Sequence, residues 1–273
     1  MTQTHTHTHG AALVTGASAG IGATYADRLA KRGHDLILVA RDAARLEELA
    51  TRLRAETGVN VEVFRADLTD PADLTGLEDR LAQDSTIDLV VNNAGAALFG
   101  GFLEHGPEQI ENLIRLNVVA VTRLANAAAK AFNARSRGTL INVGSVVGLL
   151  PEYRSVVYGA TKAFVLYLTQ GLNEEIGGAG VTFQVVLPGA TRTEIWERSG
   201  RDPSTLDPDR TMDVDELVDA ALAGLDKGEL VTIPSLPDPA DWDAFQATRL
   251  KMAPNLSKAH PAVRYGVRVP VDT

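Results

Sequence analysis

The chain has 273 residues, no cysteine and a formal net charge of −9, with a sequence pI near 5.2. This length suits one large α/β domain, although it would also permit two small ones. The acidic balance disfavours nucleic acid and anionic lipid as partners, and the lack of cysteine excludes disulfides, thiolate metal sites and a cysteine nucleophile. No apolar run reaches the ~20 residues that a membrane helix needs, so a small-molecule partner is expected and a membrane is not.

The first ten residues, MTQTHTHTHG, lack the basic and apolar regions of a secretory signal, so we expect a cytoplasmic protein. His5, His7 and His9 would point the same way on an extended chain and could share a metal ion. A polar terminal segment with nothing to pack against is more often a disordered tail. We therefore predict a disordered tail over residues 1–10 and no bound metal.

From residue 11 to about 234, short apolar runs alternate with longer segments of helical period. The runs are continuous rather than alternating, which is typical of parallel strands covered on both faces. Seven runs are predicted as strands: 11–15, 35–40, 61–66, 88–93, 138–145, 181–187 and 229–234. The pattern predicts a single-domain, Rossmann-like α/β fold over residues 11–235, doubly wound around a seven-stranded parallel sheet. Ligands of such a sheet bind at the carboxyl ends of its strands.

The segment TGASAGIG follows the first predicted strand and carries Gly16, Gly20 and Gly22. Glycines at such positions let the chain turn tightly and let its backbone approach a pyrophosphate. The helix that follows directs its first N–H groups at the anion. A glycine pattern alone is weak evidence, but its place between a strand and a helix is what a dinucleotide-binding turn requires.

Three further motifs follow predicted strands: ADLTD with Asp67, NNAG at 92–95 and PGATRT at 188–193. Each alone could be turn chemistry or a helix cap, but four such turns at one sheet edge are hard to explain by packing. From residue 11 to about 234 the chain resembles the short-chain dehydrogenase/reductase family, whose glycine turn has the form T-G-x-x-x-G-I-G. The resemblance implies these cofactor-binding residues: Gly16, Ser18, Gly20, Ile21, Gly22, Arg41, Asp67, Leu68, Asn93, Ala94, Gly95, Tyr158, Lys162, Pro188, Gly189, Thr191 and Thr193.

Tyr158 and Lys162 are four residues apart in YGATK and therefore lie on one face of a predicted helix. A free phenol titrates near ~10, so a nearby ammonium would be needed to bring this tyrosine into range. The resemblance implies a catalytic set formed by Asn117, Ser145, Tyr158 and Lys162. An ordinary exposed Tyr–Lys pair is the alternative, and the complete set argues against it.

The resemblance also implies a role for each member of this set. Tyr158 would exchange a proton with the substrate while the nicotinamide exchanges hydride. Ser145 would hydrogen-bond the substrate oxygen. Lys162 would lower the pKa of the tyrosine and hold the ribose, and Asn117, in a long helix after NNAG, would position a water that relays protons to it.

The choice between NAD and NADP depends on Arg41 and Asp42, at the end of the second predicted strand. An arginine there can pair with a 2′-phosphate, which an acid would repel. Asp42 is better interpreted as the cap of the following helix. The glycine turn has Ala19 where NADP-preferring relatives often have a basic residue. Arg45 is therefore the residue that could assist Arg41 in binding a 2′-phosphate. We expect NADP(H) in preference to NAD(H).

The loops expected around the substrate are largely apolar, which favours a hydrophobic ketone or aldehyde. Their candidate residues, which could equally be core or interface, are Leu98, Val147, Tyr153, Ile195 and Trp196. The expected protein is a carbonyl reductase that acts on C=O and CH–OH groups. The alternatives are an NAD-linked alcohol dehydrogenase and a non-catalytic NADP(H) sensor, which would have no use for the acid–base set.

Residues 236–273 are longer than the carboxyl ends of many tetrameric relatives. Pro239, Trp242, Phe245 and Leu250 suggest one amphipathic helix, followed by an extended basic arm. We expect this segment to pack on the same domain or on a dimer partner. The family resemblance implies a homodimer through the helices after strands four and five, with a homotetramer as the alternative.

Overall fold

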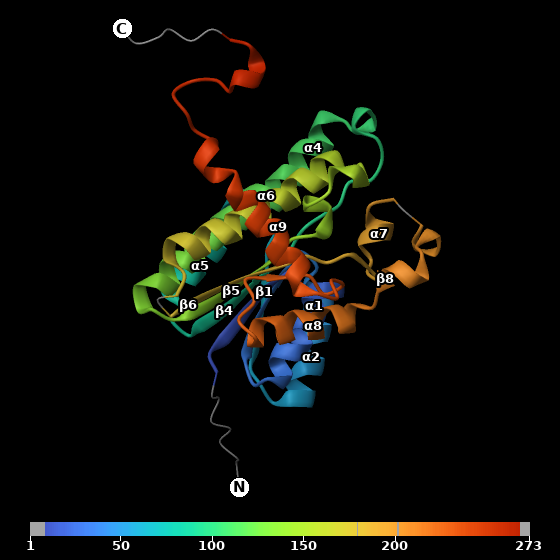
Figure 1. The fold of residues 1–273 in the computed structure, drawn as a ribbon. Helices are drawn as coiled ribbons and strands as arrows, with labels where there is room; N and C mark the ends of the chain where they lie inside the picture. The colour runs from blue at the N-terminus through green and yellow to red at the C-terminus, as the bar shows by residue number, and fades with distance from the viewer. Residues whose placement is uncertain (1–8, 179, 201, 268–273) are drawn as a thin grey trace. The chain divides into compact units, whose positions relative to one another are not determined.

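The structure is a computed structural model that describes residues 9–178, 180–200 and 202–267 (Figure 1). The chain divides into two compact units, Met1–Pro234 and Ser235–Thr273. The second unit contains α9 (Pro239–Lys251), which begins after its cap Asp238, so the helix expected near Pro239 is present. The predicted packing of this segment stays a prediction. Residues 1–8 of the predicted tail lie outside the described residues. Its last two residues contact the domain, contrary to the expected disorder: His9 stacks on His34, and the Gly10 N–H donates to Asp88 at 3.0 Å.

The first unit is built on a parallel sheet of seven strands in the order β3-β2-β1-β4-β5-β6-β9. The strands are β1 (Ala11–Thr15), β2 (Asp35–Ala40), β3 (Val61–Arg65), β4 (Ile87–Asn92), β5 (Gly138–Val143), β6 (Val181–Val186) and β9 (Val231–Thr232). The predicted fold is confirmed, although β5 ends two residues before Ser145 and β9 is only two residues long. Two-residue strands β7 (Ala190–Thr191) and β8 (Thr211–Met212) form a separate pair, which is too short to give a periodic signal.

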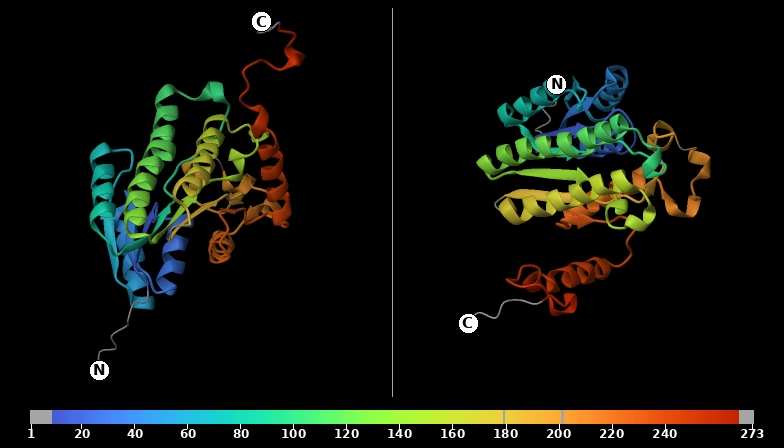
Figure 2. Two further views of the ribbon diagram at one scale, coloured as in Figure 1. Left: turned by 60° about the vertical axis from the view of Figure 1, so that its left-hand side comes forward. Right: turned by 90° about the horizontal axis from the view of Figure 1, so that it is seen from above.

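Helices cover both faces of the sheet, as the three layers in Figure 2 show. One face packs against α1 (Gly20–Lys31), α2 (Ala43–Thr57) and α8 (Val214–Asp226). The other face packs against α3 (Pro71–Gln83), α5 (Val121–Arg135) and α6 (Val156–Ile176). Alternate residues of β1 enter the two cores, Ala12 and Val14 one, Ala11 and Leu13 the other. No helix in the described ranges is long and apolar enough to cross a membrane.

The strand order reverses at β1, because β2 and β3 are added on one side of it and β4, β5 and β6 on the other. In open parallel sheets the crevice at such a switch point is where ligands bind, outside the carboxyl ends of the strands. The glycine turn follows β1 and the NNAG turn follows β4. The fold therefore brings two of the predicted motifs to one crevice.

Candidate active site

The glycine turn has the geometry of an anion cradle. Gly16 and Gly20 have φ of 67° and 53°, in the left-handed region that favours glycine. A Cβ on Gly22 would lie 2.3 Å from the carbonyl oxygen of Gly16, so no side chain fits there. The N-cap residue of α1, Ala19, supplies no side-chain hydrogen bond, which leaves the first N–H groups of the helix for an anion. Ser18 and Ile21 are half-buried within the turn.

The NNAG turn is fastened to the glycine turn through Thr15, a residue that sequence reasoning missed. The Thr15 hydroxyl accepts hydrogen bonds from the backbone N–H groups of Asn93 (2.9 Å) and Ala94 (3.0 Å). The Asn93 side-chain amide donates to the Thr15 carbonyl oxygen at 2.9 Å. The Asn93 side chain therefore holds the two turns together. The signal for Thr15 was its place directly before the glycine turn.

Asn117 lies in a short π-helix, η2 (Arg115–Ala120), which joins α4 (Pro107–Ile114) to α5, rather than inside a regular long helix. Its side-chain oxygen accepts from the Ala96 N–H at 3.0 Å, and its amide donates to the Ala96 carbonyl at 2.9 Å. The amide also donates to the Thr161 hydroxyl at 3.2 Å. Short π segments are frequent at functional sites because they change the direction of one side chain.

Lys162 is buried, and its ammonium donates a hydrogen bond to the Val143 carbonyl oxygen at 2.8 Å. Its Nζ lies 5.8 Å from the centroid of the Tyr158 ring. A Cβ on Gly95 would lie 3.6 Å from the same Nζ and 3.3 Å from the Asn117 oxygen. The NNAG turn, η2 and α6 therefore meet around Lys162, and the predicted catalytic residues Asn117, Tyr158 and Lys162 are brought together.

Burial shifts the pKa values of Tyr158 and Lys162 in the directions that favour the neutral form of each side chain. It raises the pKa of Tyr158 to about 12, against the effect of a hydrogen bond with the Ser145 hydroxyl, so this pKa is not lowered by Lys162 as the resemblance implied. It lowers the pKa of Lys162 to about 8. At neutral pH the phenol therefore keeps its proton, and most of the lysine keeps its charge.

Ser145 is buried and connects the loops that follow β5 and β6. Its hydroxyl donates to the Pro188 carbonyl oxygen at 3.3 Å and accepts from the Val147 N–H at 3.3 Å. It is the cap of the short 3₁₀ helix η3 (Val146–Gly148), not the last residue of a strand as expected. The cap position places the hydroxyl at the carboxyl edge of the sheet, beside Tyr158.

Arg41 lies at the edge of the crevice with 74% of its side chain exposed. A carboxylate oxygen of Asp67 is 3.9 Å from its guanidinium. Burial of Asp67 would raise its pKa, but hydrogen bonds from Thr69 and the charge of Arg41 outweigh this and lower it. Asp42 accepts a hydrogen bond from the Arg45 N–H at 3.1 Å, which confirms it as the cap of α2.

Arg45, considered above as possible help for Arg41, is engaged elsewhere. Its guanidinium contacts both carboxylate oxygens of Glu194, at 3.0 and 2.8 Å. Glu194 precedes α7 (Ile195–Arg198), so the ion pair joins α2 to the segment after β6. The exposed Arg41 is therefore more available to a ligand than Arg45.

The PGATRT segment lies against the glycine turn, since a Cβ on Gly20 would be 3.2 Å from the Thr193 side chain. Thr191 is buried and its hydroxyl donates to the Gly189 carbonyl at 3.1 Å. Leu68, predicted to bind the cofactor, has its side chain in the hydrophobic core, which leaves its backbone for that role.

The predicted substrate residues differ in their burial and in their contacts. Trp196 stacks on Phe99, with ring centroids 5.0 Å apart and planes 10° apart. Val147 lies beside the start of α6, with its carbonyl oxygen 3.1 Å from where a Cβ of Gly159 would be. Leu98 and Ile195 are half-buried, whereas Tyr153 is 57% exposed.

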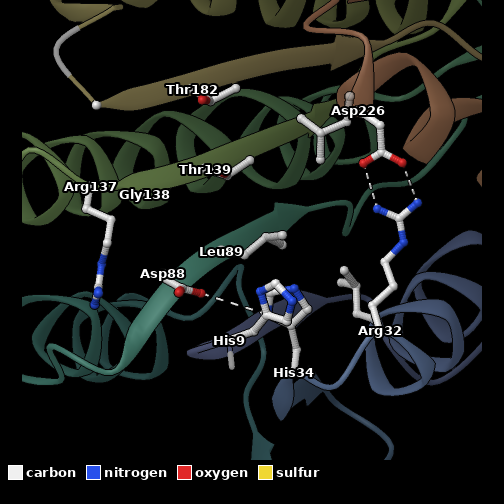
Figure 3. Close-up of a pocket in the computed structure, with 13 residues that line it drawn as sticks. His9, Arg32, His34, Asp88, Leu89, Arg137, Gly138, Thr139, Thr182 and Asp226 are labelled. Carbon is white, nitrogen blue, oxygen red and sulfur yellow. Dashed lines mark hydrogen bonds and ion pairs between the residues drawn. The ribbon is translucent and has the colours of Figure 1, made fainter. Parts of the chain in front are cut away.

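A cavity of about 340 Å³ opens at the other end of the sheet, at the amino ends of the strands (Figure 3). Its charges are largely balanced, because Arg32 pairs with Asp226 at 2.8 Å and His34 lies 3.9 Å from Asp88. Arg137 also lines it. This cavity is separate from the residues predicted to be catalytic, which follow the carboxyl ends.

The arrangement places the chain in the class of Rossmann-fold oxidoreductases. The family model for short chain dehydrogenases matches residues 10–204, so the chain belongs to the short-chain dehydrogenase/reductase family, as its motifs predicted. These matched residues include the glycine turn and the whole predicted catalytic set.

Solved structures of family members resemble nearly the whole chain. A short-chain dehydrogenase from Sphingobium yanoikuyae in complex with NADPH is 55% identical, with a TM-score of 0.91, over 94% of this chain and 99% of that chain. A bulky-bulky ketone specific alcohol dehydrogenase from Comamonas testosteroni is 48% identical, with a TM-score of 0.87, over 94% and 98%. The human 17-beta-hydroxysteroid dehydrogenase type 3 is 33% identical over 67% of this chain, which spans 60% of the human protein.

Proposed function

We propose that this chain is an NADP(H)-dependent carbonyl reductase that converts a hydrophobic ketone or aldehyde into the alcohol, with Tyr158 as the proton donor. The observation that carries the proposal is the buried Lys162 ammonium 5.8 Å from the Tyr158 ring, with Ser145 hydrogen-bonded to the phenol. Similarity to an NADPH complex and to a ketone-specific alcohol dehydrogenase supports it.

The chain fits a dinucleotide because a Cβ would clash at Gly22 in its glycine turn and because no side chain caps the first N–H groups of α1. Gly16, Gly20 and Gly22 would hold the pyrophosphate, Asp67 the adenine and Lys162 the nicotinamide ribose. When bound, the nicotinamide supplies the hydride that reduces the carbonyl carbon.

Residues of the protein would stabilise, and then neutralise, the negative charge that develops on the carbonyl oxygen. The Ser145 hydroxyl donates a hydrogen bond to this oxygen and stabilises its negative charge. Tyr158, protonated at neutral pH, transfers its proton to the same oxygen. The Lys162 ammonium then stabilises the phenolate that remains. Asn117, fixed by Ala96 and Thr161, holds the loop beside Lys162 and would position the relay water.

Replacing Arg41 by aspartate should shift cofactor preference from NADP toward NAD. An exposed guanidinium can form charge-assisted bonds with a 2′-phosphate, whereas a carboxylate repels it. We expect the ratio of kcat/KM for NADPH over NADH to fall roughly 10- to 100-fold. The matched control is Lys227→Asp, the same charge change at an exposed residue after α8. Comparable efficiencies with both cofactors in the unmodified protein would contradict the preference.

We also propose that the chain forms a homodimer through α6. Val156, Phe164 and Tyr167 are exposed on one side of this helix, Tyr167 by 78%. A row of exposed apolar side chains is typical of a surface that another protein covers. Sedimentation equilibrium should give a dimer mass, and Tyr167→Glu should give a monomer. A monomeric unmodified protein would contradict this proposal.

The direct test of the activity follows NADPH absorbance with a panel of hydrophobic ketones and aldehydes. We expect carbonyl-dependent loss of the reduced cofactor. If the protein binds NADPH but no compound of the panel causes its oxidation, a non-catalytic NADP(H) sensor would be favoured instead. Faster alcohol oxidation with NAD than carbonyl reduction with NADPH would favour the oxidative enzyme.

A further inference from the structure

Phe99 and Trp196 form an aromatic stack between two loops of the crevice edge. Phe99 lies in the loop after β4, and Trp196 lies in α7, after β6. In the sheet, β5 runs between β4 and β6, and the loop after β5 carries Ser145. The stack therefore joins the two loops that flank the loop of the proposed oxyanion-stabilising serine. Such a position adjoins the place where a carbonyl substrate would lie.

The tryptophan is fixed on its own segment by contacts that do not involve Phe99. Its indole N–H donates to the Thr191 carbonyl oxygen at 2.7 Å. Two residues earlier, Glu194 pairs with Arg45 of α2 at 2.8 Å and with Arg198 at 2.6 Å. These contacts hold the ring on a supported segment, so it presents a defined apolar surface rather than a mobile one.

The surroundings favour a neutral, apolar ligand group at this surface. Both rings are half-buried, so part of each remains open to a ligand. Of the arginines that the structure describes close to Trp196 in sequence, Arg192 pairs with Asp213 at 2.7 Å and Arg198 pairs with Glu194 at 2.6 Å. They therefore do not offer a free guanidinium to an anionic substrate.

We propose that Phe99 and Trp196 form the specificity-determining wall of the substrate site, against which the larger apolar substituent of a ketone packs. This proposal rests on the carbonyl reductase function proposed above. A cyclic or aromatic substituent would bury apolar surface against the two rings, whereas a methyl group would not reach it. The wall therefore selects for substituent size and not for charge.

The first test compares two ketones that differ in one substituent, cyclohexyl methyl ketone and acetone. Phe99→Ala and Trp196→Ala should each lower the ratio of their kcat/KM values by roughly tenfold or more, because a lost apolar contact discriminates on this scale. The KM for NADPH should stay unchanged. Trp196→Phe, which keeps an aromatic ring, should retain most of the ratio. The control Phe102→Ala, an exposed ring in the same loop, should not change it.

Equal losses for both ketones, with an unchanged ratio, would overturn the proposal, since the stack would then only support the loops. The double variant should lose little more than either single variant, because the two rings act as one surface. Fully additive losses would contradict a shared wall.

A binding measurement separates failure of this proposal from failure of the proposed function. The chain has two tryptophans and five tyrosines, so Trp242→Phe leaves Trp196 as the only tryptophan, whose emission is selected by exciting at wavelengths that tyrosine does not absorb. With NADP⁺ bound, cyclohexyl methyl ketone should change Trp196 emission with saturation, and adding Phe99→Ala should weaken the apparent affinity roughly tenfold. A saturable response without turnover would support the wall and contradict the reductase. No response, or one unaffected by Phe99→Ala, would overturn the wall even in an active enzyme.

Discussion

Replacing Tyr158 by phenylalanine should lower kcat for ketone reduction about 10²- to 10⁴-fold, which is the usual contribution of a positioned acid. Phenylalanine keeps the ring whose centroid is 5.8 Å from Lys162 but removes the hydroxyl that hydrogen-bonds Ser145. NADPH affinity should change little, because the glycine turn and Arg41 are untouched. Single-turnover absorbance measures the chemical step, and NADPH fluorescence measures binding.

Tyr167→Phe provides the matched control for this prediction. Tyr167 lies on the same helix, α6, and is 78% exposed, so its hydroxyl has no expected part in proton transfer, and phenylalanine keeps its apolar ring. This variant should reduce ketones at the unmodified rate. If Tyr158→Phe kept its rate as well, the assignment of the proton donor would be wrong.

Replacing Lys162 by methionine should lower kcat about a hundredfold or more and should also weaken NADPH binding. The side chain of methionine fills similar space but lacks the ammonium that stabilises the phenolate and, as proposed, holds the ribose. The simultaneous effect on binding distinguishes this variant from Tyr158→Phe. Lys130→Met, at an exposed position of α5, is the control and should leave both quantities unchanged.

The burial of the same lysine predicts the sign of the pH dependence of the proposed reductase activity. Burial lowers its pKa to about 8, so its charge is present below that pH and lost above it. The phenol, with its pKa raised to about 12, stays protonated across this range. We therefore expect kcat/KM for the ketone to fall as pH rises through about 8. The Lys162→Met variant should lack this step, and an identical step in the variant would assign it to another group.

Sequence reasoning could predict the sheet and the polar turns because both depend on local signals. Apolar runs separated by helical periods define the parallel strands. The turn motifs each follow a strand, so the topology alone brings Gly16, Asn93 and Ser145 to one edge. The cap role of Asp42 was also readable, since capping depends on residues three positions apart.

What could not be predicted depends on contacts between distant residues. Arg45 and Glu194 are 149 residues apart in sequence, and their pairing changes which arginine is open to a 2′-phosphate. The Phe99–Trp196 stack likewise joins two loops, and nothing in their sequences predicts which of their residues meet. The π-helix that carries Asn117 has a helical sequence pattern, and the Asn117 side chain bonds Ala96 and Thr161, which are distant from it in sequence.

The central claim is that the chain transfers hydride from NADPH to a carbonyl carbon. Reduction of cyclohexyl methyl ketone with NADPH that carries deuterium at the transferring position of the nicotinamide tests it most directly. Mass spectrometry of the alcohol should find one deuterium, bound to the carbinol carbon. Two results would contradict the account. One is an alcohol without deuterium when NADPH carries the label at the transferring position, and the other is no alcohol from a protein that binds NADPH.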